Sequence, residues 1–177
     1  MLSRSLPTVS FVDPGFVSDP GESEENNDDI RYGENFVSKV VNAVFHSPNW
    51  KNTVLIYTYD EHGGYYDHVP PPAAIAPDSI PPKLGPGDVP GGYDIYGPRV
   101  PAVVVSPYSK PNAVTNVVHD HTSFLATVEA KWNLPALTYR DANAKTVKDF
   151  LNLEAPAFLQ PPTIAEAPAP VGAATTP

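Results

Sequence analysis

Apolar residues along this 177-residue chain recur with two different spacings, which predict helices and strands. Across residues 33–47 they recur at intervals of three and four, so this segment is expected to be a helix that ends before Pro48. Shorter apolar runs at residues 8–12 and 54–59 predict a strand on either side of it. A strand, a helix and a second strand in this order favour a parallel pair joined by a crossover.

The second half of the chain shows the same two patterns. The run at residues 100–107 predicts a short buried strand bounded by prolines. A helix is expected to begin within residues 120–123, with Thr122 or Asp120 as its N-cap. Residues 142–151 predict a last short helix.

Residues 72–98 are rich in proline and glycine and cannot hold a helix or a central strand. A loop of this length in a compact domain is usually functional or disordered. Because it directly follows a segment rich in carboxylates and histidines, it is interpreted as a lid or a substrate-shaping insertion. The alternative is a tolerated surface excursion. The domain is expected to cover residues 1–153, and the Pro/Ala-rich residues 154–177 are expected to be a disordered tail.

Composition narrows the possible partners. The net charge of −9 and pI near 4.8 argue against nucleic acid and against simple attraction to an anionic membrane. The chain has no cysteine, which excludes disulfides and thiolate catalysis, and it has no apolar run of about 18 residues that predicts a transmembrane helix. A phosphate-containing substrate needs a local positive centre, which a bound metal ion can supply.

Most candidate chemistry lies in residues 60–68, after the strand predicted at 54–59. Asp60 and Glu61 are adjacent at the carboxyl end of that strand, where ligands bind in open α/β sheets. There both carboxylates can converge on a cation, while Gly63 and Gly64 permit a sharp turn. The alternative is that the carboxylates only cap a turn and that His68 makes a structural hydrogen bond.

Other polar residues carry two interpretations each. Arg99 could contact a phosphate group or pair with a nearby carboxylate, and His121 could lie close to the site. These two residues are the candidates for substrate binding. Asp120 is at least as suited to capping a helix, and His119 is expected to be exposed.

Four segments resemble the phosphoesterase family of bacterial and plant non-specific phospholipases C and AcpA-type acid phosphatases. Residues 60–69 match its DExxGxxDHV motif, and residues 97–107 match its GxRVPxxxxxP motif. Residues 120–123 (DHTS) and 132–142 also look like the family's C-terminal region. The resemblance extends over about residues 6–162.

The resemblance implies an α/β fold like that of alkaline phosphatase, with a mostly parallel central sheet flanked by helices and metal at the strand ends. It implies that Asp60 and Glu61 ligate a divalent metal ion of unknown identity. Asp67 and His68 complete the motif and are expected near the site as catalytic residues, either as partners of the metal ligands or as a proton donor. The implied reaction is hydrolysis of a phosphate ester, in a phospholipid or a phosphomonoester.

Two family motifs are not found in this chain: the N-terminal ENRSFD motif, which supplies further metal ligands, and the TxPNR motif near the nucleophile. None of the available hydroxyl groups stands in the family's nucleophile context; they belong to Ser106, Ser109, Thr122 and Ser123. The chain is therefore expected to be an incomplete, C-terminal portion of a family member.

Two hypotheses follow from this incompleteness. In the first, the chain is the metal-binding part of a phosphoesterase that is completed by the missing N-terminal part of the same protein. In the second, it is a catalytically silent or partner-dependent fold that only binds cations. Secreted or periplasmic residence, usual for bacterial relatives, is suggested by the resemblance alone.

Overall fold

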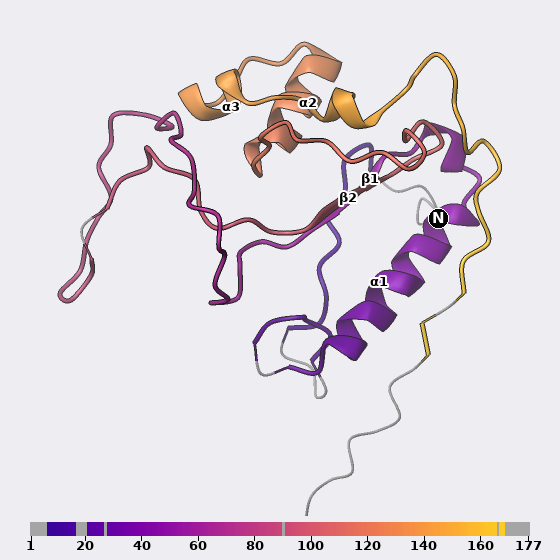
Figure 1. Ribbon diagram of the computed structural model, residues 1–177. Coiled ribbons are helices and arrows are strands. Elements are labelled where there is room, and N and C mark those ends of the chain that lie inside the picture. Colours follow the sequence, from indigo (N-terminus) through magenta and orange to yellow (C-terminus); the bar gives the residue numbers. More distant parts are fainter. Residues whose placement is uncertain (1–6, 17–20, 27, 90, 166, 169–177) are drawn as a thin grey trace, which may run out of the picture. The chain divides into compact units, whose positions relative to one another are not determined.

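A computed structural model describes residues 7–16, 21–26, 28–89, 91–165 and 167–168 (Figure 1). The chain forms two compact units. Unit 1 comprises Met1–Ser47 and Thr163–Pro177, and unit 2 comprises Pro48–Pro162. No helix in the described part is both long and apolar enough to cross a membrane.

Unit 1 is built on α1, Ile30–Phe45. The helix begins three residues before its predicted start because the Asp29 side chain accepts a hydrogen bond from the Arg31 backbone N–H at 3.1 Å and caps it. A stretch of the C-terminal segment lies along this helix: Asn35 Nδ2 donates to the Ala167 carbonyl at 2.9 Å, and the Ala167 N–H donates to Ser38 Oγ at 3.0 Å. Ala167 therefore has defined contacts, although it lies in the segment for which disorder was predicted.

The strand predicted at residues 8–12 does not form. These residues are exposed and pair with no strand among the described residues. An apolar run becomes a strand only when a partner strand satisfies its backbone groups, so the pattern alone gave a wrong prediction here.

Unit 2 contains a two-stranded sheet (Figure 1). Strand β1, Leu55–Thr58, pairs antiparallel with β2, Ala102–Val105, in the register that places Leu55 opposite Val105 and Thr58 opposite Ala102. Both strands were predicted within two residues of their ends. The described part thus combines helices and strands, as an α/β fold does, and its one sheet is antiparallel. The mostly parallel central sheet stays a prediction.

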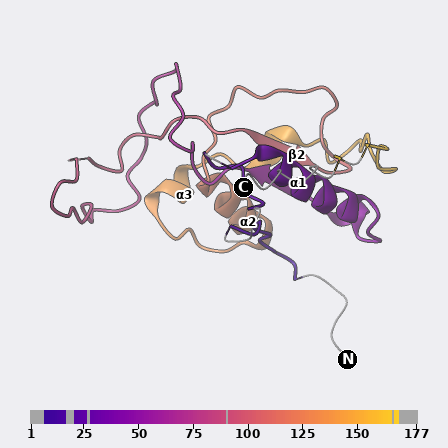
Figure 2. The ribbon, with the colours of Figure 1, turned by 90° about the horizontal axis from the view of Figure 1, so that it is seen from below.

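Three short helices follow β2. Helix α2, Thr122–Trp132, packs against α3, Tyr139–Asn143, and against the 3₁₀ helix η2, Val147–Phe150 (Figure 2). The single helix predicted at residues 142–151 is therefore wrong, because Ala144 adopts an extended conformation with ψ 148° and separates α3 from η2. Helix α2 ends at Asn133, whose left-handed φ of 53° reverses the chain.

The apolar core of unit 2 is small. Trp50, in the 3₁₀ helix η1 (Trp50–Asn52), is 4% exposed and donates its indole N–H to the Phe158 carbonyl at 2.9 Å. Val147, Ala126 and Pro107 are the other buried apolar side chains described in this unit. The Phe158 N–H also donates to the Pro107 carbonyl at 3.0 Å, so residue 158 of the predicted tail is attached to unit 2.

Residues 72–98 leave this body as a long excursion and return to it (Figure 1). Their described residues contain no helix and only an isolated bridge between Ala73 and Ile95. The base is closed by the Ala74 N–H, which donates to the Asp94 carbonyl at 2.7 Å, and by the Tyr96 N–H, which donates to the Pro72 carbonyl at 3.0 Å. We call residues 72–98 the Pro/Gly loop.

Candidate active site

The two candidate metal ligands lie just beyond the end of β1. Asp60 and Glu61 are both exposed. Asp60 Oδ1 accepts a hydrogen bond from the Glu61 N–H at 3.1 Å, and Glu61 Oε1 accepts one from the Gly63 N–H at 2.9 Å. Each carboxylate thus accepts a backbone hydrogen bond within the turn, as expected if the pair only caps a turn. Both side chains are also exposed, so a cation in solvent can reach them.

The turn that follows requires glycine. Gly63 and Gly64 have φ values of 62° and 75°, in the left-handed region that side chains with a Cβ rarely adopt. The Tyr65 N–H donates to the His62 carbonyl at 3.0 Å and closes the turn. The sharp glycine turn predicted from the sequence is confirmed.

The two histidines of the motif differ in their surroundings. His62 Nδ1 lies 3.5 Å from Glu61 Oε2, next to the carboxylate pair. His68 Nδ1 lies 3.9 Å from Asp67 Oδ1, and its side chain is 82% exposed. His68 can therefore reach a ligand in solvent, and its catalytic role stays a prediction.

Asp67 and Arg99 form the strongest polar contact of the site. Arg99 Nη2 donates to Asp67 Oδ1 at 2.8 Å, and Arg99 Nε and backbone N–H donate to Oδ2 at 2.9 and 3.0 Å. The Val69 N–H adds a bond to Oδ1 at 3.0 Å. Side-chain hydrogen bonds from Arg99, followed by these backbone bonds, hold the pKa of Asp67 well below its usual range, and the contact raises the pKa of Arg99.

This geometry bears on the roles predicted for both residues. Asp67 is held as an anion, which suits a residue that positions a neighbour more than one that gives up a proton. The guanidinium of Arg99 is engaged by the carboxylate, yet its side chain remains 61% exposed. The catalytic role of Asp67 and the substrate-binding role of Arg99 stay predictions.

An open hollow of about 430 Å³ lies beside this ion pair. Its walls come from the glycine turn and from the entrance to β2; they are formed by His62, Tyr65, Tyr66, Asp67, Arg99, Val100 and Pro101. The hollow combines a cationic side chain with aromatic rings, and one of its residues follows Glu61 directly.

His121 also reaches this region. Its Nε2 lies 2.8 Å from the carbonyl oxygen of Tyr59, the residue before Asp60, and its ring makes an edge contact with Phe124. Because a carbonyl oxygen only accepts hydrogen bonds, Nε2 carries the proton. Asp120 Oδ1 accepts bonds from the Thr122 N–H and hydroxyl at 2.9 and 2.6 Å. The N-cap of α2 is nevertheless His121, whose side chain makes no capping bond, so the N-cap predicted at Thr122 or Asp120 is wrong by one residue.

His119 is not exposed, contrary to the prediction. Its side chain is 15% exposed, with Nε2 3.1 Å from Asp149 Oδ1 and Nδ1 3.3 Å from Ser123 Oγ. Burial raises the pKa of Asp149, but hydrogen bonds from Thr115 and His119 outweigh it and lower that pKa overall. The sequence did not reveal this burial, because the carboxylate partner Asp149 lies thirty residues away along the chain.

The candidate hydroxyl groups are engaged in structural bonds. Ser106 and Ser123 are 1% and 0% exposed, and Ser106 Oγ donates to the Thr53 carbonyl at 2.9 Å. Ser109 Oγ donates to the Val104 carbonyl at 2.8 Å, and the Thr122 hydroxyl donates to Asp120. Each of the four hydroxyl groups thus has a structural hydrogen-bond partner.

The donor chemistry at Asp60 and Glu61 fits a divalent cation in part. Two exposed carboxylates suit hard cations, and His62 lies beside them. Within the described part of the chain, however, no group of three or more such side chains is arranged to hold a metal ion. A metal bound here would need ligands from water, substrate or another polypeptide segment.

Comparison with known proteins identifies the family. A model described as "Phosphoesterase family" matches residues 1–135. The chain belongs to the phosphoesterase family. This membership makes it a relative of phosphate-ester hydrolases, and it confirms the resemblance predicted from the four motifs.

Several phospholipases C are similar to this phosphoesterase. Non-specific phospholipase C6 of Arabidopsis thaliana is 34% identical over 162 residues, covering 83% of this chain and 31% of the relative. Phospholipase C B of Mycobacterium tuberculosis is 33% identical over 172 residues, covering 87% and 31% respectively. Non-hemolytic phospholipase C of Burkholderia pseudomallei is 36% identical over 140 residues, covering 73% and 19%. The chain thus spans about a third or less of the length of these relatives.

Proposed function

We propose that the chain is the metal-binding, C-terminal part of a metal-assisted phosphoesterase that hydrolyses phosphate esters in the manner of a phospholipase C. The observation that carries this proposal is the position of Asp60 and Glu61, exposed together at the end of β1 in a member of the phosphoesterase family. The relatives named phospholipase C favour a phospholipid over a phosphomonoester as substrate. A small phosphomonoester, the substrate of an acid phosphatase, is the alternative within the same chemistry.

In this proposal Asp60 and Glu61 hold the divalent cation. A cation bound there polarises the phosphoryl oxygens and offsets the charge that develops during transfer. The hydrogen bonds from the Glu61 and Gly63 backbone N–H groups fix one oxygen of each carboxylate, so the pair is preorganised by the glycine turn.

The remaining residues of the motif act on the substrate and the leaving group. Overall, hydrolysis forms a bond between phosphorus and an oxygen that comes from water, and it breaks the bond between phosphorus and the alcohol oxygen. The leaving alcohol must gain a proton. His68 is proposed as the proton donor because its imidazole is exposed next to Asp67. Asp67 anchors Arg99, whose exposed guanidinium lines the hollow and is proposed to bind a phosphate oxygen. His121, tied to the Tyr59 carbonyl, is proposed to border the same substrate.

We also propose that the fold is completed as an alkaline phosphatase-like α/β domain with a mostly parallel central sheet. Within the described part, β1 pairs with β2 alone, and its four residues are only half-buried. Apolar strands of this kind are usually covered on both faces in α/β proteins. Strands from the missing N-terminal part of the same protein would pair with this sheet and bring further metal ligands and the nucleophile.

A second candidate function is a catalytically silent chain that binds cations. It is favoured by the number of ligands, because the described residues supply two adjacent carboxylates and no arrangement of three or more ligands. The engagement of all four candidate hydroxyls in structural bonds points the same way.

Hydrolysis assays separate the two candidates. The purified chain is assayed with p-nitrophenyl phosphate and with phosphatidylcholine, with and without a chelator, while calorimetry measures binding of Mn²⁺ and Ca²⁺. Turnover that the chelator abolishes supports the hydrolase, whereas cation binding without turnover supports the silent chain.

Variants test the site assignment. Asp60→Ala and Glu61→Ala are expected to abolish both cation binding and turnover. Asp78→Ala is the matched control, since Asp78 is an exposed carboxylate that accepts a similar turn bond, from the Ile80 N–H at 2.7 Å. Unchanged turnover in the Asp60 and Glu61 variants would show that the metal site lies elsewhere.

A further inference from the structure

One arginine outside the motif at residues 60–69 contacts both the Pro/Gly loop and the start of α2. Arg140, in α3, donates from Nη2 to the Tyr93 carbonyl and from Nη1 to Asp120 Oδ2 at 3.4 Å. Its guanidinium carbon lies 5.2 Å from the centre of the Tyr96 ring. The side chain is 16% exposed, so these contacts are largely shielded from solvent.

Tyr139, which precedes Arg140, makes a hydrogen bond to the outgoing arm of the loop. The Tyr139 N–H donates to the Pro77 carbonyl at 2.9 Å, while Tyr93 and Tyr96 belong to the returning arm. The first turn of α3 is thus attached to both arms of the Pro/Gly loop, close to the Ala73–Ile95 bridge that closes its base.

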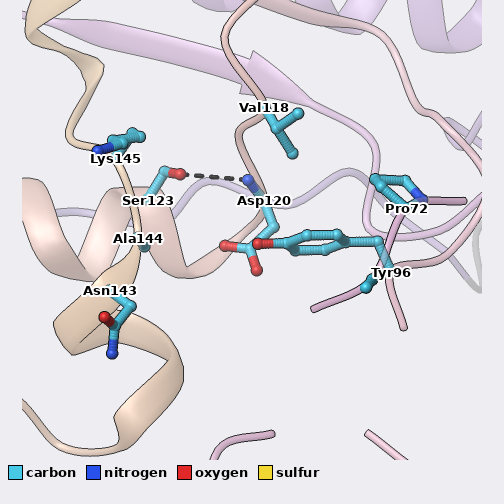
Figure 3. A pocket seen from close by; sticks show the side chains of 9 residues that line it. Pro72, Tyr96, Val118, Asp120, Ser123, Asn143, Ala144 and Lys145 are labelled. Carbon is cyan, nitrogen blue, oxygen red and sulfur yellow. Dashed lines mark hydrogen bonds between the residues drawn. The ribbon is translucent and has the colours of Figure 1, made fainter. Parts of the chain in front are cut away.

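Apolar packing contributes little to the position of this loop. Ile80 and Val89 are 69% and 85% exposed, and Leu84 is 49% exposed. Between the loop base and the helices lies a cavity of about 250 Å³, with Pro72 and Tyr96 on one side and Ser123, Asn143 and Lys145 on the other (Figure 3). Because the base is not packed tightly against α2 and α3, polar contacts must hold it there.

These contacts continue into the candidate active site. Asp120, which Arg140 binds, precedes His121, and His121 reaches the Tyr59 carbonyl next to Asp60. Asp67 precedes the loop in the sequence and Arg99 directly follows it, so their ion pair joins the segments on either side of the loop. A shift of the loop relative to α2 would therefore change the surroundings of the carboxylate pair.

We propose that Arg140 is a positioning residue, which fixes the base of the Pro/Gly loop against the start of α2 and so sets the wall that a phospholipid substrate meets beside the site. The inference rests on the proposed function for its catalytic consequence. Only arginine suits this position, because its planar guanidinium stacks on Tyr96 while it donates in different directions to Tyr93 and Asp120.

Hydrogen exchange measured by mass spectrometry or NMR tests the attachment of the loop without need of catalysis. In Arg140→Ala and in Arg140→Lys, the amides of Ala74, Tyr96 and Tyr139 are expected to exchange about tenfold faster, the factor that corresponds to one net charge-assisted hydrogen bond. Amides in the β1–β2 pair are expected to keep their rates. Lys145→Ala is the control, because it removes an exposed cation that lines the same cavity.

Three results would overturn the proposal: unchanged exchange in Arg140→Ala, faster exchange that extends equally to β1 and β2, or a lysine variant indistinguishable from the wild type. If the chain turns over substrate, Arg140→Lys is expected to raise KM for phosphatidylcholine about tenfold while kcat and the hydrolysis of p-nitrophenyl phosphate stay near wild type. Equal losses of kcat on both substrates would contradict the positioning role. A chain without any turnover would remove the proposed function, and the exchange rates would still decide whether Arg140 fixes the loop.

Discussion

Arg99 binds the carboxylate of Asp67 through Nη2 at 2.8 Å, through Nε at 2.9 Å and through its backbone N–H at 3.0 Å. The two residues lie 32 positions apart in the sequence, and their pairing joins the segments before and after the Pro/Gly loop. It links Arg99, which is expected to bind phosphate, to Asp67, which is expected to assist catalysis. Because the pair also joins two distant segments, it has a structural role whether or not the chain is active.

Asp67→Asn is expected to loosen this junction and lower the melting temperature, because the amide accepts through one oxygen only and carries no charge. The pKa of Asp67 is depressed in the folded chain, so its contribution to stability is complete above the ordinary value of 3.8 and is lost as the pH falls through the lowered pKa. The difference in melting temperature between wild type and variant should be constant from pH 7 to about 4 and shrink below that. Circular dichroism measures it.

Asp78→Asn is the control for this experiment, since Asp78 accepts one backbone hydrogen bond and has no arginine contact among the described residues. Its melting temperature is expected to stay near that of the wild type. A difference between Asp67→Asn and wild type that already disappears near neutral pH would contradict the assigned pairing.

The sequence predicted local elements well because their signals are local. Apolar spacing located α1, β1, β2 and α2 within a few residues, and Gly63 and Gly64 indicated a turn with positive φ. The motif also predicted that Asp60 and Glu61 would lie at the end of a strand. These predictions needed no knowledge of residues far away in the chain.

Predictions that depended on distant partners were incomplete or wrong. Residues 8–12 had an apolar pattern but no partner strand among the described residues, and His119 became shielded because Asp149 approaches it. Likewise the apolar spacing at 142–151 could not show that the chain extends at Ala144. The pairing of Arg99 specifically with Asp67 and the several contacts of Arg140 depend on tertiary structure, which spacing along the chain does not encode.

The small core of unit 2 makes it sensitive to a single cavity. Val147 is 1% exposed, and its N–H donates to Thr127 Oγ1 at 3.0 Å. Val147→Ala is expected to lower the free energy of unfolding by about 1–3 kcal/mol, through lost burial and the cavity left behind. Val114→Ala, at a position that is 89% exposed, is expected to change it little. Equal effects of the two substitutions in urea unfolding would contradict the assigned core.

A carboxyl pair within unit 2 should make stability depend on pH. Burial, and then a hydrogen bond shared with Asp141, raises the pKa of Glu129. Glu129 Oε1 is buried and has no hydrogen-bond partner among the described residues. Burial also acts to raise the pKa of Asp141, but bonds from Thr138, the Leu137 N–H and Glu129 outweigh it and lower that pKa. On acidification the pair therefore takes up its first proton on Glu129 rather than on Asp141.

Glu129→Gln mimics the protonated form and is expected to raise the melting temperature at pH 7. The contribution of Glu129 is complete below its ordinary pKa of 4.5 and is lost as the pH rises through the raised value in the folded chain. The advantage of the variant over wild type should consequently shrink as the pH falls toward 4.5. Glu154→Gln, at an exposed position, serves as the control. A variant less stable than wild type at pH 7 would indicate that the charged form of Glu129 is the one that the fold prefers.

His121 should act as a hydrogen-bond donor that ties α2 to the end of β1. Since Nε2 donates to the Tyr59 carbonyl at 2.8 Å, the neutral ring must be the Nε2–H tautomer, which ¹⁵N NMR can observe directly. His121→Ala is expected to lower the free energy of unfolding by about 0.5–1.5 kcal/mol and to shift the amide resonances of Asp60 and Glu61. His121→Gln can place an amide N–H at a similar distance from the backbone and should restore part of both effects. If the resonances of Asp60 and Glu61 do not shift in His121→Ala, the start of α2 does not influence the carboxylate pair. If the glutamine variant is no better than alanine, the ring contact with Phe124, rather than the hydrogen bond, holds His121 in place.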